Sequence, residues 1–125
     1  MILSPDDEVV EAVQGGKIDF ELAIVDENLR PVDTSVYDQF KVCIKLDSST
    51  ALVVSQVATG NGSIMTKVGA ATLGVFRVVI NPLDSATLKK GERQDIDFEM
   101  SENAAPTNII RQVFKDRLSV EDTSC

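Results

Sequence analysis

The chain contains neither histidine nor tryptophan, and little cysteine or tyrosine. Its 125 residues include two cysteines, one tyrosine and no tryptophan. Without histidine, serine–histidine and cysteine–histidine catalysis are excluded. The two cysteines, Cys43 and Cys125, lie far apart in sequence and supply neither an ordinary zinc site nor the disulfide framework of a small secreted domain. The composition therefore favours a protein that is not an enzyme and that needs no metal or other cofactor.

Long apolar runs and clustered positive charge are missing too. No stretch of eighteen apolar residues occurs, so the sequence predicts no segment inserted in a membrane. The first residues lack the basic start and apolar stretch of a secretory signal, which favours synthesis in a cytoplasm without export by that route. The formal net charge is −8, and residues 1–38 alone hold ten acids and two bases. Such a balance argues against a nucleic-acid partner, which needs a basic surface.

The acidic N-terminal segment shows no clear hydrophobic period. Residues 1–16 end in a pair of glycines, and we expect them to form an arm that becomes ordered on a partner. A solvated arm without a partner is an alternative, and so is a helix over residues 1–13. In the first interpretation, four acidic side chains of the arm belong to the partner interface: Asp6, Asp7, Glu8 and Glu11.

Alternation of apolar and polar residues predicts seven short strands. The clearest spans residues 17–25, where every second residue from Ile18 to Ile24 is apolar and large. The other six are expected at residues 39–46, 51–57, 64–68, 74–80, 94–100 and 108–120. Turn residues separate these segments, and no helical period of useful length is present. The pattern predicts one all-β domain, an immunoglobulin-like antiparallel β-sandwich over residues 17–122, with a short tail at 123–125.

The last two strands carry opposite charges on their outer faces, with Asp95, Asp97 and Glu99 on one strand and Arg111, Lys115 and Arg117 on the other. Opposed across an antiparallel pair, these side chains attract each other and penalise a slip by one residue. Within the final strand, Gln112 and Asp116 fall on the same face as apolar Phe114. We therefore expect a β-bulge there.

A turn-rich segment precedes the sixth strand. Asp84 is expected to cap a single helical turn, because its carboxylate can accept from the free amides that open such a turn. Leu83 and Leu88 would then pack beneath the turn. Gly91 would allow the chain to reverse. Together these residues would close one edge of the sandwich.

The segment 51–57 is apolar on both faces, at Leu52, Val53, Val54 and Val57. It precedes the short strand at 64–68. An unprotected sheet edge pairs readily with another chain, and this edge shows more apolar surface than solvent usually meets. We predict that the region 51–68 is covered by another subunit, with these four residues at the interface.

Two pairs of carboxylates are candidates for acid–base chemistry. Asp19 and Glu21 share one strand face, as do Asp95 and Asp97. Glycoside hydrolysis needs two carboxylates held across a cleft at a set separation. Both pairs are expected on exposed strand faces, so we interpret them as ordinary surface charge.

Cys43 and Tyr37 are the other residues considered as functional. The lysines on either side of Cys43 would lower its pKa, yet a redox role needs a second thiol within reach, and a half-buried thiol covered by a neighbouring subunit is the favoured interpretation. Tyr37 is the one candidate aromatic platform for a sugar, because exposed tyrosine and tryptophan are otherwise lacking.

Several of these segments together resemble a known family. Residues 61–64, 74–80, 84–91, 95–99 and 111–120 look like small immunoglobulin-like virion proteins of tailed bacteriophages. Residues 16–33 are similar to the start of the N-terminal domain of phage baseplate upper proteins, where a strand precedes an Asp–x–x–x–x–Pro turn, here Asp26 to Pro31. The likeness covers about residues 15–122. Two departures affect local loops: residues 101–107 lack the usual glycine, and Asp116 stands where glycine is frequent.

The resemblance implies a structural or adaptor protein of the phage virion, at the tail tip, baseplate or fibre attachment. Its partners would be other virion proteins and further copies of the chain, in a homo-oligomer within the particle. A capsid decoration protein is a second possibility, and a host-receptor or glycan-binding module is a third. The family implies no catalytic residues.

Overall fold

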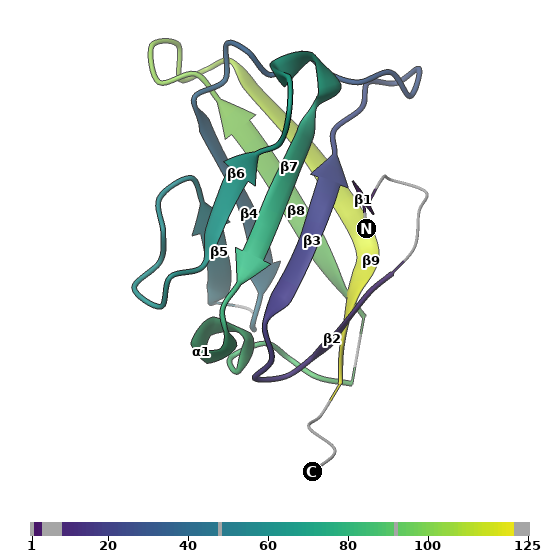
Figure 1. The fold of residues 1–125 in the computed structure, drawn as a ribbon, viewed down its shortest axis with the longest axis vertical. Helices are drawn as coiled ribbons and strands as arrows, with labels where there is room; N and C mark the ends of the chain where they lie inside the picture. Colours follow the sequence, from purple (N-terminus) through teal and green to yellow (C-terminus); the bar gives the residue numbers. More distant parts are fainter. Residues whose placement is uncertain (1, 4–8, 48, 92, 122–125) are drawn as a thin grey trace.

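The computed structural model describes residues 2–3, 9–47, 49–91 and 93–121, which form two β-sheets packed face to face (Figure 1). One sheet has the strand order β1-β3-β7-β6, and the other has the order β2-β9-β8-β4-β5. The strands are β1 (Ile2–Leu3), β2 (Val10–Val13), β3 (Ile18–Ala23), β4 (Gln39–Lys45), β5 (Ala51–Ser55), β6 (Ile64–Lys67), β7 (Val75–Ile80), β8 (Arg93–Ser101) and β9 (Ile109–Glu121). The predicted all-β sandwich is confirmed, and the seven predicted strands correspond to β3 through β9.

The strand order is that of immunoglobulin sandwiches. In such domains, strands B, E and D lie in one sheet, and G, F, C and C′ lie in the other. Here β3-β7-β6 and β9-β8-β4-β5 take those places. The two N-terminal strands depart from the antiparallel pattern, because β1 runs parallel to β3 and β2 runs parallel to β9.

The prediction of an N-terminal arm is wrong for residues 10–13. Val10–Val13 forms strand β2, which pairs with Leu118–Glu121 of β9. Val10 and Ala12 point into the core, so the side chains alternate with the period of a strand, and the alternative of a helix is also wrong for these residues. The acidic residues Asp6, Asp7 and Glu8 lie outside the described residues.

The core lies between the sheets and is built by side chains that alternate inward. All four large apolar residues predicted to face inward from β3 and its end are buried: Ile18, Phe20, Leu22 and Ile24. The ring of Phe76 lies between those of Phe40 and Phe98, with centroids 4.9 and 5.0 Å away and the planes tilted. Because Phe76 belongs to one sheet and its two neighbours to the other, this aromatic cluster joins the layers.

The predicted bulge in β9 is confirmed at Asp116. Gln94 faces Leu118, whereas Ile96 faces Phe114, so β9 contains extra residues between these pairs. Asp116 has a φ of 56°, in the left-handed region that favours glycine. Its backbone N–H donates to the Asp95 carboxylate over 2.8 Å. Glycine would adopt this backbone conformation without strain.

The segment between β7 and β8 contains the short helix α1 (Pro82–Ser85). As predicted, Leu88 is buried and Gly91 adopts a positive φ of 88°. Two other predictions are wrong: the N-cap residue is Asn81 without a side-chain cap bond, and Leu83 is 70% exposed. Among the described residues, no helix is long and apolar enough to cross a membrane.

Candidate functional site

Some of the residues predicted at the partner interface are buried in the core, and others are exposed on the surface. Leu52 and Val54 point between the sheets and are buried, so their assignment to the interface is wrong. Val53 and Val57 are exposed, to 43% and 69%. Glu11 is exposed on β2. The split follows from strand geometry, because neighbouring side chains of β5 point to opposite faces of the sheet.

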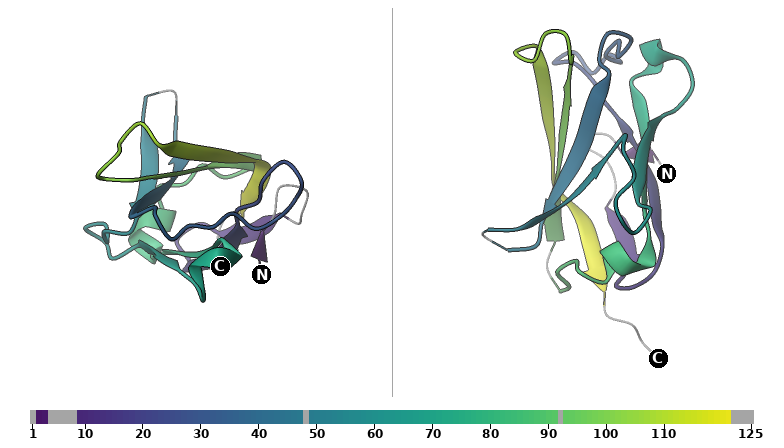
Figure 2. Two further views of the ribbon diagram at one scale, coloured as in Figure 1. Left: turned by 90° about the horizontal axis from the view of Figure 1, so that it is seen from above. Right: turned by 90° about the vertical axis from the view of Figure 1, so that its left-hand side faces the viewer.

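The exposed valines lie on or beside β5, an edge strand of the five-stranded sheet. Within the part of the chain that the structure describes, β4 is the one strand paired with β5. Figure 2 (right) looks onto this side of the molecule and shows the β4–β5 hairpin projecting from the sandwich. None of the five residues of β5 is charged or is proline. This segment therefore offers backbone hydrogen-bonding groups along an uncharged edge.

Strand β6, one of the two edge strands of the other sheet, is protected. Lys67 ends this strand, and its ammonium group donates to the backbone oxygen of Thr34 over 2.7 Å. The same nitrogen lies 6.0 Å from the centroid of the Phe40 ring. A lysine at an edge strand opposes pairing with another chain, because its charge would have to be desolvated. The two edges that follow each other in sequence thus differ in their accessibility to a partner strand.

The loop between these two strands is anchored by the buried carboxylate of Asp84. It accepts hydrogen bonds from Thr59 Oγ1 at 2.7 Å, Asn61 Nδ2 at 2.8 Å and Ser63 Oγ at 2.5 Å. Burial by itself would raise the pKa of Asp84, but these bonds outweigh it and hold the pKa below the usual value. Asp84 is therefore a structural anion, and its partners in a distant loop explain why it does not cap α1.

The same turn also holds the end of β2. The N–H of Gly15 donates to Ser85 Oγ over 2.9 Å, and Gln14 Nε2 donates to the oxygen of Leu88 over 3.0 Å. The region around α1 consequently connects the N-terminal strand, the β5–β6 loop and the start of β8. Sequence reasoning missed this role, because all of its partners are distant in sequence.

Among the described residues, the outer face of the five-stranded sheet carries the predicted charge pairing between Glu99 and Arg111. Arg111 Nε lies 3.0 Å from Glu99 Oε2, and Lys41 Nζ lies 4.0 Å from the other oxygen of Glu99. Asp97 instead faces Val113, which is 54% exposed. The prediction of opposed charges is thus confirmed for Glu99 and Arg111 and wrong for Asp97.

Cys43 is half-buried on this outer face, between Val53 and Asp97 of the neighbouring strands. Burial raises the pKa of its thiol, and the carboxylates of Asp97 and Glu99 act in the same direction against the opposing effect of Lys41. The lowered pKa predicted from the flanking lysines is therefore wrong. A thiol with a raised pKa is a weak nucleophile at neutral pH.

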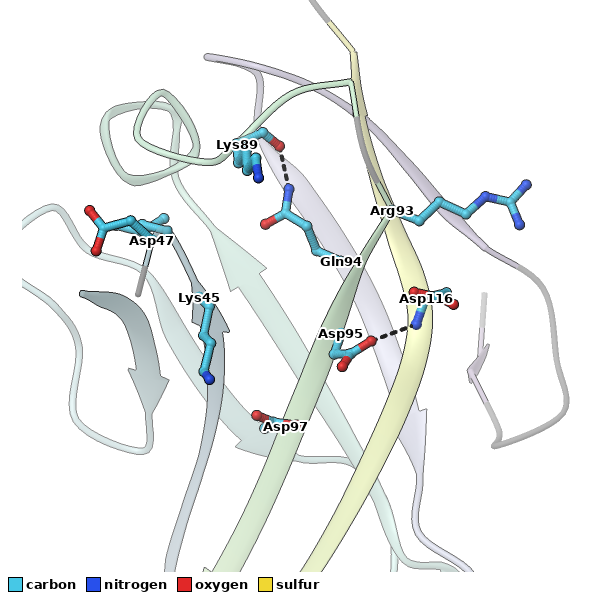
Figure 3. A pocket seen from close by; sticks show the side chains of 9 residues that line it. Lys45, Asp47, Lys89, Arg93, Gln94, Asp95, Asp97 and Asp116 are labelled. Atoms are coloured by element: carbon cyan, nitrogen blue, oxygen red, sulfur yellow. Dashed lines mark hydrogen bonds between the residues drawn. The ribbon is translucent and has the colours of Figure 1, made fainter. Parts of the chain in front are cut away.

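A polar groove of about 470 Å³ opens at one end of this face (Figure 3). Its lining carries three cationic and four anionic side chains: Lys45, Lys89, Arg93, Asp47, Asp95, Asp97 and Asp116. Gln94 also lines the groove, and its Nε2 donates to the backbone oxygen of Lys89. In the described ranges, no group of three or more histidine, cysteine or acidic side chains is placed to hold a metal ion. The mixed charge favours no ligand of a single sign.

Two further candidates have structural roles. Asp19 accepts from Nε and Nη2 of Arg77, at 2.9 and 2.5 Å, and this pairing lowers the pKa of Asp19. A carboxylic acid that protonates a substrate needs the opposite shift. Tyr37, the one candidate platform for a sugar, is buried, and its hydroxyl lies 3.5 Å from Asn108 Oδ1.

The strand order defines the class of the protein as an immunoglobulin-like β-sandwich. Among solved structures, the chain is similar to the N-terminal domain of phage TP901-1 ORF48, with a TM-score of 0.59 and 18% sequence identity. The match covers 96% of this chain and 94% of that one. No family model and no curated protein matches the sequence. The likeness shows that the two share a fold over nearly their whole lengths.

Proposed function

We propose that the chain is a structural or adaptor component of a phage virion, located at the tail tip, baseplate or fibre attachment. The observation that carries this proposal is the likeness in fold to the N-terminal domain of a phage protein, because it extends over nearly all of both chains. The chain would act by contacts with neighbouring subunits, through the exposed edges and faces of the sandwich.

The turn on which the sequence resemblance depends has a defined structure, which supports the proposal. Asp26 Oδ1 accepts from the N–H groups of Asn28 and Arg30, at 2.8 and 3.0 Å. Val25 and Pro31 form an antiparallel bridge that closes the loop. Leu29 at its tip has a φ of 61° and a side chain that is 67% exposed. The Asp–x–x–x–x–Pro pattern therefore encodes a compact turn that presents an apolar side chain.

The electrostatics of the described surface suit an assembly component. Some of its charged side chains form cross-strand pairs, such as Asp19–Arg77 and Glu99–Arg111. The same surface also carries exposed apolar side chains, including Val53 and Val113. Interfaces between subunits combine such apolar centres with polar surroundings. A sugar-binding role has less support, since the one tyrosine is buried.

The location can be tested on particles of the phage that encodes the chain. Heads and tails would be separated and each probed with an antibody raised against residues 9–121, together with gold labelling in electron microscopy. We expect the chain in the tail fraction and label at the tail end. Label confined to heads would indicate a capsid decoration protein, and its absence from particles would exclude a virion role.

A further inference from the structure

We propose that β5 is a docking edge for a second copy of this chain, which contributes its own β5 in an antiparallel pair centred on Val53. The inference rests on the proposed function, because the contact would form within an assembled particle. The geometry of the contact is derived from the backbone and sequence of β5. The contact would be isologous, with the same five residues on both sides of a two-fold axis.

The phase of the β4–β5 ladder shows which backbone groups are directed away from β4. At its two ends, Leu46 donates to Thr50 over 3.0 Å and Gln56 donates to Phe40 over 3.3 Å. Hydrogen-bonded pairs alternate with non-bonded pairs along an antiparallel ladder, so Leu52 and Val54 bond to β4. The N–H and C=O groups that face the open edge consequently belong to Ala51, Val53 and Ser55.

The sequence of β5 is nearly palindromic in side-chain size, with small Ala51 and Ser55 at its ends, branched Leu52 and Val54 inside them, and Val53 at the centre. A two-fold axis at Val53 places Val53 opposite Val53 of the second copy, and Ala51 opposite Ser55. These facing pairs are the ones whose backbone groups point to the open edge, so each exchanges two hydrogen bonds. Like-sized side chains meet at every position, which favours the chain's own copy over a foreign strand.

The surrounding charges permit the pairing. The nearest cations on the outer face are Lys41 and Lys45 of β4, opposite Ser55 and Ala51. In the paired sheet, Lys45 of one copy and Lys41 of the other would be three strand spacings apart, roughly 14 Å. That separation exceeds the Debye length of about 8 Å at physiological ionic strength, so their repulsion is screened. By contrast, β6 places Lys67 on its own strand and is unsuited to such a contact.

Cysteine cross-linking tests both the contact and its register. In a chain with Cys43→Ser and Cys125→Ser, Val53→Cys places two thiols opposite each other, at a Cα separation of about 5.5 Å that a disulfide can bridge. Under mild oxidation we expect a disulfide-linked dimer. Ser55→Cys is the matched control, because residue 55 faces residue 51 of the second copy. A sample of the Ser55→Cys variant by itself should form disulfide-linked dimers at least about tenfold more slowly. A mixture of the Ser55→Cys and Ala51→Cys variants should form them readily.

Sedimentation of the Val53→Lys variant provides a second measurement. We expect the unmodified chain to associate reversibly as its concentration rises, and Val53→Lys to remain a folded monomer. Equal cross-linking of Val53→Cys and Ser55→Cys, or unchanged association of Val53→Lys, would overturn the proposed contact. If the chain were found in virions despite such results, the virion function would stand and this contact alone would fail. Absence from particles would instead refute the function and leave the dimer measurable in solution.

Discussion

The two edge strands β5 and β6 follow each other in the chain and are built in different ways. The first is uncharged, and its outward-facing Val53 is 43% exposed. The second ends in Lys67, whose ammonium group is bonded to Thr34, and the loop before it is fastened to Asp84. The domain therefore protects β6 with a lysine and an anchored loop, whereas β5 carries neither a charged residue nor proline. An open β5 is thus a property of the sequence of this strand and not a requirement of the sandwich.

Lysine substitutions at two neighbouring positions of β5 should differ most in their effect on the free energy of unfolding. Val54→Lys would bury an unpaired charge in the core, and we expect it to lower the free energy of unfolding by more than about 3 kcal/mol or to prevent folding. Val53→Lys should cost less than about 0.5 kcal/mol, as other surface substitutions do. Urea unfolding at low protein concentration would measure both. Similar losses for the two variants would show that β5 is not an edge with one open face.

Removing the anchor of the loop before β6 should have the next largest effect. Asp84→Ala leaves three hydrogen-bond donors without their acceptor, and we expect a loss of about 2–4 kcal/mol in the free energy of unfolding. Leu83→Ala, at an exposed neighbouring position, is the control and should change stability little. If both variants unfolded at the same urea concentration, the loop would not depend on this carboxylate.

The contribution of Asp84 should also depend on pH in a defined direction. Its folded pKa is lowered, so the stabilisation is complete above the unfolded value of about 3.9 and is lost as pH falls through the folded pKa. The difference in unfolding free energy between the unmodified chain and Asp84→Ala should therefore be constant near neutral pH. It should shrink below about pH 4. A difference that grew on acidification would contradict the assignment.

The ion pair between β8 and β9 should contribute less to the free energy of unfolding than the buried groups near the two edges. Glu99 and Arg111 are partly exposed, so a double-mutant cycle to alanine should give a coupling of about 0.2–1 kcal/mol, weakened by salt. The same cycle for Asp97 and Arg111 should give none, because Asp97 faces Val113. Coupling of equal size in both cycles would mean that general charge, rather than this pair, stabilises the strands.

The smallest expected effect on stability comes from Asp47, in the turn that leads into β5. Asp47 accepts hydrogen bonds from the backbone of Ser49 and Thr50 and from the Ser49 hydroxyl, which lowers the pKa of Asp47 to about 2. Its ionised form supports the turn above the usual carboxyl pKa, and that support is lost as pH falls towards 2. Titration followed by NMR should give this value, and Ser49→Ala should raise it in part. An ordinary value would mean that the turn is open in solution.

Local patterns were sufficient to predict β3 through β9 from sequence. The alternation in these segments matches the observed burial, as at Phe40, Val42 and Ile44 of β4, because each strand has one face in the core. The bulge could be predicted as well, since Asp116 interrupts the apolar face of β9. A pattern of period two carries this information without knowledge of the partner strand.

Features that depend on distant partners could not be predicted in this way. Strand β2 has four residues, and what places them in a sheet is pairing with Leu118–Glu121. Asp84 has the local signal of a cap, but its carboxylate is taken by residues more than twenty positions earlier. Leu52 and Val54 were assigned to a surface because their segment is apolar on both faces, and sequence alone does not show which face meets the core.

The parallel pairing of β2 with the end of β9 has a consequence for synthesis on the ribosome. The residues that complete this sheet are among the first and the last described residues to be made, since Val10 pairs with Leu118 and Gln14 donates to Glu121. The N-terminal strand must therefore wait, unpaired, until residue 121 has left the exit tunnel. Contacts so distant in sequence form slowly. During that interval Val10 and Ala12 lack the strand beside which they are buried in the folded domain.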